Sequence, residues 1–133
     1  MNLSRWSGTL LSVLRIVAAF LFIAHGTSKL FGFPSPPGEP AHTVELASLA
    51  GIAGILEALG GAFLLVGLFT RPVAFLLSGE MAVAYFLKHA PGSFWPLLNH
   101  GEAAVMFCFV WLYIASAGPG PWSLDAMRQR GKV

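Results

Sequence analysis

Apolar residues gather in four long stretches of the chain, at residues 9–31, 44–69, 72–89 and 97–117. A helix needs ~20 apolar residues to cross a bilayer, so these stretches have the length of membrane spans. The third is the shortest, and it reaches full length only by including Lys88 and His89, whose polar ends extend to the interface. The pattern therefore predicts an all-α protein. We expect a single integral-membrane domain over residues 1–133, a four-helix bundle with a polar C-terminal tail at residues 118–133.

Proline and glycine separate the stretches, at residues 32–38, 71–72, 91–96 and 118–121. Because four spans leave both termini on one side, the lysines and arginines can be counted for each side. Lys29 and Lys88 lie on the side opposite the termini, and the six other cations lie on the terminal side: Arg5, Arg15, Arg71, Arg128, Arg130 and Lys132. Both termini are therefore expected in the cytoplasm. The charges within the first stretch favour a retained span, since the core of a signal peptide is uncharged.

The chain is 56% hydrophobic and only 11% charged, whereas soluble domains carry about 25% charged residues. So few charges argue against a soluble monomer, which would expose large apolar patches, and against a disordered chain. The net charge of +2 comes from scattered cations, so nucleic acid is not an expected partner and the lipid bilayer is. Cys108 is the sole cysteine, which excludes an intramolecular disulfide and a dithiol pair within this chain.

Three charged residues lie inside the predicted spans: Arg15, Glu57 and Glu80. A charge at the middle of a bilayer costs about 2.5–3.5 kcal/mol even on the lenient insertion scale, so these groups must be paired or hydrated. Helical rise places Arg15 about 9 Å, Glu80 about 12 Å and Glu57 about 18 Å from the inner ends of their spans. We therefore predict that they form one buried polar cluster. It is either an ion-pair group that fixes helix packing or a proton or ligand site.

A second polar cluster is predicted toward the outer ends of the spans, formed by His25, Lys29, Lys88, Asn99, His100 and Glu102. His25 and Lys29 share one face of the first helix, and Asn99 and Glu102 share one face of the fourth. An ion pair between Lys29 and Glu102 is the expected partnership. No local motif such as H-E-x-x-H joins the histidines to Glu102, so no metal site is predicted.

Four motifs in order, one for each predicted helix, give the chain a family resemblance. They are HGTSKLFG at residues 25–32, EALGG at 57–61 continuing to GLFTR at 67–71, EMAVAY at 80–85 followed by His89, and NHGEAA at 99–104, with Gly118 and SLD at 123–125 closing the pattern. The chain resembles the DoxX family of small four-helix bacterial membrane proteins over roughly residues 10–126. It departs from the family pattern at His100, where a glycine is usual.

The resemblance implies a multi-pass protein of the bacterial inner membrane. Members of the family resemble subunits of thiosulfate–quinone or quinol-oxidising complexes, and others associate with proteins that handle thiol or superoxide stress. The resemblance therefore implies other membrane or membrane-associated redox subunits, or further copies of the chain, as partners. The cysteine pairs of the dithiol-bearing branches are absent here.

Three functions fit these observations. In the first, the chain is a membrane oxidoreductase subunit that binds a quinone or similar lipid-soluble substrate at the buried cluster, with a pocket lined by Phe22, Tyr85 and Phe86. No other cofactor is evident from the sequence. In the second, the chain is a non-catalytic accessory or assembly subunit of a larger membrane complex. In the third, the same charges form a pathway for protons or a small solute.

Overall fold

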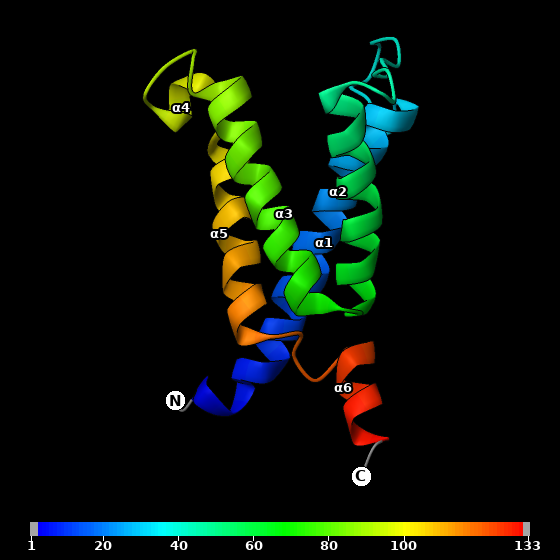
Figure 1. The fold of residues 1–133 in the computed structure, drawn as a ribbon, viewed down its shortest axis with the longest axis vertical. Coiled ribbons are helices and arrows are strands. Elements are labelled where there is room, and N and C mark those ends of the chain that lie inside the picture. The colour runs from blue at the N-terminus through cyan, green and yellow to red at the C-terminus, as the bar shows by residue number, and fades with distance from the viewer. Residues whose placement is uncertain (1–2, 132–133) are drawn as a thin grey trace.

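A computed structural model describes residues 3–131, and this part of the chain is helical with no strand (Figure 1). The 3-10 turn η1 (Leu3–Trp6) leads into α1 (Ser7–Phe31), which is followed by α2 (Leu49–Val66) and α3 (Thr70–Ala84). A π-helical turn, η2 (Tyr85–His89), extends α3. The short α4 (Pro96–Asn99) precedes α5 (Glu102–Ala117), and α6 (Leu124–Arg130) ends the described chain. The predicted all-α class is confirmed for these residues.

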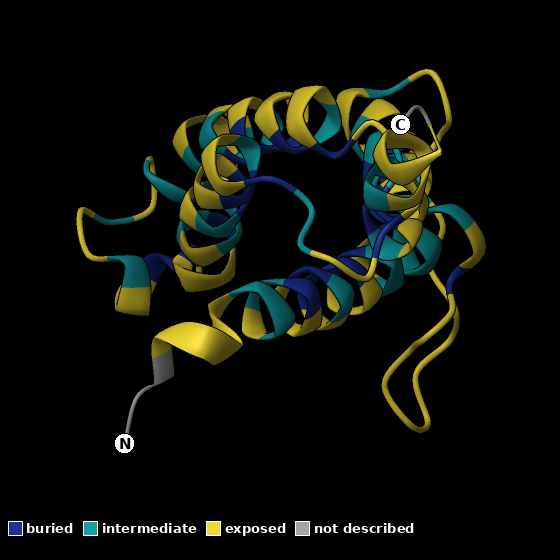
Figure 2. Ribbon diagram, turned by 90° about the horizontal axis from the view of Figure 1, so that it is seen from below, coloured by how far each residue is buried: buried dark blue, intermediate teal, exposed yellow. Residues whose placement is uncertain are grey.

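The long helices form two neighbouring pairs, α1 with α2 and α3 with α5 (Figure 1). Their exposed faces point outward and their buried faces point toward one another (Figure 2). The buried apolar side chains make one core at this junction: Ala18, Ala19, Phe22, Leu64, Ala74, Leu77, Met81, Ala104, Trp111 and Ile114. Within the described residues, the helix at Ser4–Phe31 and α2 are long and apolar enough to cross a membrane, and α5 is apolar but shorter.

The first two helices approach closely because a glycine lies at their contact. A Cβ atom on Gly26 would lie 2.5 Å from the backbone nitrogen of Ala58 and 2.8 Å from the carbonyl oxygen of Gly54. Such a contact is available only to a residue without a side chain, as is common where helices pack in lipid. This close packing of α1 against α2 lies near Lys29 on α1 and Glu57 on α2.

The second helix begins later than the sequence predicts. Residues 44–48 form a loop and a turn, and α2 begins at Leu49 after an N-cap at Ser48, whose hydroxyl accepts a hydrogen bond of 3.0 Å from the backbone N–H of Gly51. A serine in this position satisfies one of the free N–H groups at a helix start, which explains the boundary. Apolar composition alone did not locate it.

The residues after α5 do not extend away as a simple polar tail. Figure 2 shows their connection crossing beneath the long helices before it enters α6. The backbone N–H of Trp122 donates to the Ser12 hydroxyl at 3.1 Å, and the N–H of Asp125 donates to the carbonyl of Gly67 at 2.9 Å. Residues 118–131 therefore pack against the ends of α1 and α2. Lys132, counted above on the terminal side, lies outside the described residues.

Candidate functional site

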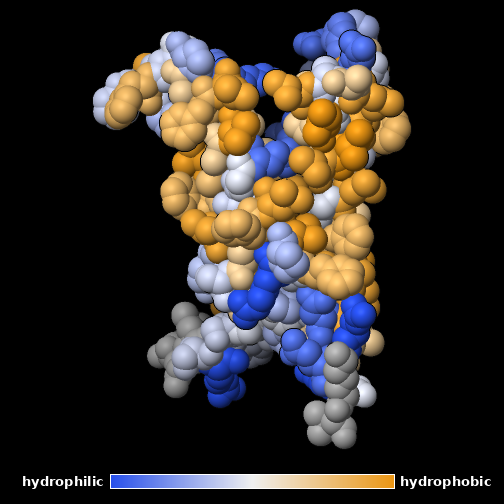
Figure 3. All heavy atoms as spheres, in the orientation of Figure 1, coloured by the Kyte–Doolittle hydropathy of each residue, from blue (hydrophilic) through white to orange (hydrophobic). Residues whose placement is uncertain are grey.

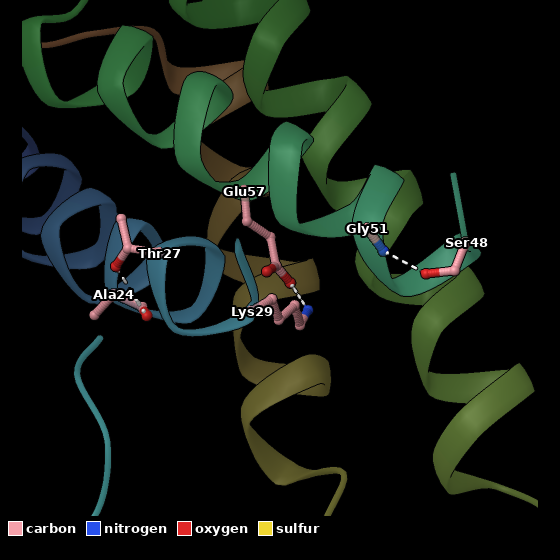
Figure 4. A network of polar contacts seen from close by, with 6 residues as sticks. All are labelled: Ala24, Thr27, Lys29, Ser48, Gly51 and Glu57. Atoms are coloured by element: carbon pink, nitrogen blue, oxygen red, sulfur yellow. Dashed lines mark hydrogen bonds and ion pairs between the residues drawn. The ribbon is translucent and has the colours of Figure 1, made fainter. Parts of the chain in front are cut away.

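An ion pair joins the last turn of α1 to α2. The Lys29 Nζ atom lies 2.6 Å from Glu57 Oε1, and it donates a hydrogen bond to that oxygen (Figure 4). The Glu57 side chain is 3% exposed and the Lys29 side chain is 30% exposed. The carboxylate thus lies inside the protein, while the ammonium group links it to the surface.

Glu80 brings a second carboxylate to this pair from α3. It interacts electrostatically with both Glu57 and Lys29. The helix register explains why: Gly60 lies against Leu77, where an added Cβ would approach the leucine side chain to 2.9 Å. Because α2 and α3 run in opposite directions, moving one helical turn from this contact brings Glu57 and Glu80 to the same level.

Three carboxylate oxygens at this level are buried without a hydrogen-bond partner among the described residues. They are Glu57 Oε2 and both side-chain oxygens of Glu80. Buried polar atoms are nearly always hydrogen-bonded, and each exception calls for an explanation. We call Lys29, Glu57 and Glu80 the carboxylate site. With one cation and two carboxylates, it becomes neutral when it holds one proton.

Arg15 does not belong to the carboxylate site, so its predicted association with Glu57 and Glu80 is wrong. Its guanidinium group is buried, and it donates only to backbone carbonyls within the described chain: Leu65 and Pro119 at 2.8 Å each, and Leu64 and Trp122. Arg15 lies fourteen residues before Lys29, about 21 Å along the helix axis, which is beyond the reach of its side chain. It binds instead to two carbonyls in the last turn of α2, those of Leu64 and Leu65, and to two in the segment that follows α5.

The predicted outer cluster separates into unconnected parts. The expected Lys29–Glu102 pair is wrong, since Lys29 pairs with Glu57 and Glu102 is exposed in the first turn of α5. Lys88 and His100 are also exposed. His25 is exposed as well, with its ring edge-on to Phe107 at a centroid distance of 5.8 Å.

Asn99 organises a separate network above the carboxylate site. Its amide donates to the Tyr85 hydroxyl at 3.2 Å and to the Ser93 carbonyl at 2.9 Å, and its side-chain oxygen accepts from the Gly101 N–H at 2.8 Å. His89 Nδ1 lies 3.0 Å from the Asn99 carbonyl oxygen. These bonds shape the turn between α4 and α5, so Asn99 and His89 have a structural role here.

Comparison with known proteins identifies the family of the chain. The model of the DoxX family matches residues 10–90, which include Lys29, Glu57 and Glu80. The chain belongs to the DoxX family. A Haemophilus influenzae protein described as uncharacterized is 41% identical to this DoxX chain over 128 residues, covering 93% of this chain and 94% of that protein. No solved structure matches the chain.

The three aromatic residues predicted to line a pocket differ in their surroundings in this DoxX protein. Phe22 is buried in the core, with ring centroids 5.0 Å from Phe107 and 5.4 Å from Trp111. Tyr85 accepts the hydrogen bond from Asn99. Phe86 is 69% exposed. Among the described residues, no three His, Cys, Asp or Glu side chains gather as a metal site.

The end of this DoxX chain that carries α6 holds an anchor that the sequence analysis missed. The Asp125 carboxylate accepts hydrogen bonds from the backbone N–H groups of Phe69 at 3.0 Å and Thr70 at 2.8 Å, at the start of α3. Asp125 lies in α6, whose N-cap is Ser123; the Ser123 hydroxyl accepts a hydrogen bond from the Ala126 N–H at 3.1 Å. A serine followed by an aspartate after a glycine–proline run is a helix-start signal that could have located α6.

Proposed function

We propose that this DoxX-family chain is a multi-pass protein of the bacterial inner membrane. In this proposal it is a subunit of a membrane oxidoreductase that binds a quinone or similar lipid-soluble redox substrate at the carboxylate site. The observation that carries the proposal is the unpartnered, buried carboxylate of Glu80 beside the Lys29–Glu57 pair. A polar group is retained at such a place only at a cost to stability, which favours a functional role.

The surface supports a position within a bilayer. Large apolar side chains point outward along the long helices, including Phe20 at 64% exposed, Phe75 at 67% and Phe109 at 64%. Figure 3 shows this apolar surface as a broad band, with hydrophilic residues gathered at the end that carries α6. We assign four spans, made by α1, α2, α3 with η2, and α5, with the termini in the cytoplasm because most cations lie on that side.

The chemistry of the carboxylate site suits a quinone. A quinone oxygen accepts hydrogen bonds, and the Lys29 ammonium group and one protonated carboxyl group are both donors. Full reduction of a quinone adds two electrons and two protons to give the quinol. In the proposed reaction a partner subunit supplies both electrons. The carboxyl group passes one proton to a quinone oxygen, and the partly exposed Lys29 ammonium group passes the other and is reprotonated from the aqueous side.

The approach to the site is proposed from the outer end of the bundle. Figure 3 shows a notch between the two helix pairs at this end, with hydrophilic atoms below it. Lys29 is partly exposed, while the opposite end is closed by the buried Arg15 and the carbonyl groups around it. A substrate head group entering from the outer half of the membrane would meet Lys29 first.

Direct binding tests the proposal. A short-chain benzoquinone is titrated into the purified protein in detergent, and the dissociation constants of Glu80→Gln and Glu57→Gln are compared with that of the parent. Because an amide is a weaker donor than a carboxyl group, each variant is expected to bind the quinone roughly 3- to 10-fold more weakly than the parent. Glu39→Gln, in an exposed loop, is the matched control and should bind like the parent. Equal affinity in all four proteins would refute the site.

A further inference from the structure

A pocket at the inner end of the molecule lies between the start of α3 and helix α6. Its volume is about 280 Å³, and its walls include Phe69, Thr70, Arg71, Asp125, Arg128 and Gln129. We infer that this pocket binds the phosphate group of an anionic phospholipid of the cytoplasmic leaflet. The inference uses the membrane orientation of the proposed function but not its quinone site.

The two arginines of the pocket retain hydrogen-bonding capacity. Arg71 donates through Nη1 to the carbonyls of Ala115, at 3.0 Å, and Ser116, and among the described residues its other guanidinium nitrogens have no hydrogen-bond partner. Arg128 lies over the Phe69 ring, 5.4 Å from its centroid, and it makes no hydrogen bond within the described chain. Free guanidinium N–H groups in a forked arrangement match the oxygens of a phosphate.

The acidic residue of the pocket cancels only part of this charge. Both Asp125 oxygens accept backbone N–H groups at the start of α3, and its charge also acts on Arg128, so it offsets one of the two arginine charges. Counting Arg71, Arg128 and Asp125 leaves one net positive charge. That charge matches a phosphodiester with a single negative charge. A lipid such as phosphatidylglycerol fits, whereas the cationic head of phosphatidylcholine would be repelled by the arginines.

The surroundings place the pocket where lipid head groups lie. Phe69, on its wall, is 53% exposed, and its ring packs against Phe63, 6.4 Å away between centroids. Phe63 on α2 and Phe75 on α3 are exposed, at 40% and 67%. A lipid with its phosphate between the arginines would therefore lay its acyl chains along α2 and α3. Basic pockets between spanning helices on the cytoplasmic side are typical head-group sites.

Lipid titration of the purified full-length protein tests the inference. The protein in neutral detergent receives phosphatidylglycerol or phosphatidylcholine of the same chain length, and bound lipid is counted by native mass spectrometry. Phosphatidylglycerol should be retained and should raise the melting temperature. Arg128→Gln should weaken its binding roughly fivefold. Arg130→Gln, on the same helix but outside the pocket lining, is the matched control and should bind like the parent.

Separate additions of inorganic phosphate and glycerophosphate distinguish a lipid from a free phosphate. Neither should reproduce the shift at millimolar concentration, and a shift of the same size would overturn the lipid assignment. Equal binding of both lipids, or equal loss in Arg128→Gln and Arg130→Gln, would overturn it as well. Quinone binding by Arg128→Gln is measured in parallel and should be unchanged, so failure of this site and failure of the carboxylate site are separable.

Discussion

Lys29 and Glu57 form an ion pair of 2.6 Å across the contact between α1 and α2, and the carboxylate is the more deeply buried partner. Removing the cation alone leaves a buried charge without its counter-ion, which typically costs about 3–5 kcal/mol. Lys29→Met should therefore lower the free energy of unfolding by this amount, as measured by denaturation in mixed micelles. Lys88→Met, at an exposed position, should leave it nearly unchanged.

A double-mutant cycle separates the interaction energy of the Lys29–Glu57 pair from the contributions that each residue makes by itself. Lys29→Met combined with Glu57→Gln removes both charges, and it should recover much of the stability that Lys29→Met loses. Additive losses in the double variant would contradict the pairing. Additive losses would show that Lys29 and Glu57 each stabilise the protein through other neighbours.

Glu80 should behave in the opposite way to Glu57. Its carboxyl oxygens are buried without partners in the described chain, so Glu80→Gln removes a carboxyl group that no hydrogen bond within that part of the chain stabilises. We expect the melting temperature of Glu80→Gln to equal or exceed that of the parent, while quinone binding falls. A residue kept for function at a cost to stability shows this combination. Thermal unfolding and quinone titration of the same preparations measure both effects, and a melting temperature as low as that of Glu57→Gln would contradict the expectation.

The sequence predicted the positions of the helices better than it predicted which side chains pair between them. Each apolar stretch overlaps one long helix, because a run of apolar residues is a local property of the sequence. The bounds differ: α2 begins at Leu49 and not at residue 44, and the stretch at 97–117 is broken at His100 and Gly101 into α4 and α5. Apolar length could not tell which faces meet, since small rotations of a helix change every contact. Lys29 was assigned to Glu102 on the fourth stretch, but the close approach at Gly26 brings α1 against α2 and so toward Glu57.

Arg15 shows a second limit of the same kind. The sequence analysis sought acidic partners for it, whereas the protein satisfies it with backbone carbonyls from Leu65 and Pro119. Such acceptors exist at every residue, so no sequence pattern marks them. The position of Arg15 along its helix was the available signal, since it lies beside the end of α2, where the last carbonyls of a helix lack partners within the helix.

Asp125 should make the free energy of unfolding depend on pH. Burial raises the pKa of this carboxyl group, but hydrogen bonds from Thr70 and Phe69 and the charge of Arg128 outweigh that effect and hold the pKa below its usual value. The group therefore contributes stability above its unfolded pKa, and the contribution is lost as pH falls through the lower folded pKa. Asp125→Asn should lose about 1 kcal/mol at neutral pH, as a weakened helix cap does.

Unfolding measured from neutral to strongly acidic pH tests this cap. The difference in stability between the parent and Asp125→Asn should shrink toward the acidic end, because the parent carboxyl group becomes protonated there. Glu39→Gln, in an exposed loop, should show no such convergence. A constant difference across the whole range would mean that Asp125 acts through packing and not through its charge.

Gly26 should tolerate no side chain where α1 meets α2. A Cβ atom there would lie 2.5 Å from the Ala58 backbone nitrogen, and a helix backbone cannot yield as a flexible side chain does. Gly26→Ala is expected to cost about 1–3 kcal/mol through overpacking. It should also weaken the Lys29–Glu57 pair, since separating the helices lengthens the gap that the lysine bridges.

Gly79→Ala provides the control on α3, since an added Cβ would meet nothing within 4 Å. It should leave stability unchanged or raise it by up to about 1 kcal/mol, because alanine favours the helix over glycine. The two alanine variants are compared by thermal unfolding and by quinone titration. If Gly26→Ala were as stable as Gly79→Ala, the two helices would not be in close contact at this glycine. If Gly26→Ala unfolds early and also loses quinone affinity, the α1–α2 contact positions the carboxylate site as well as stabilising the fold.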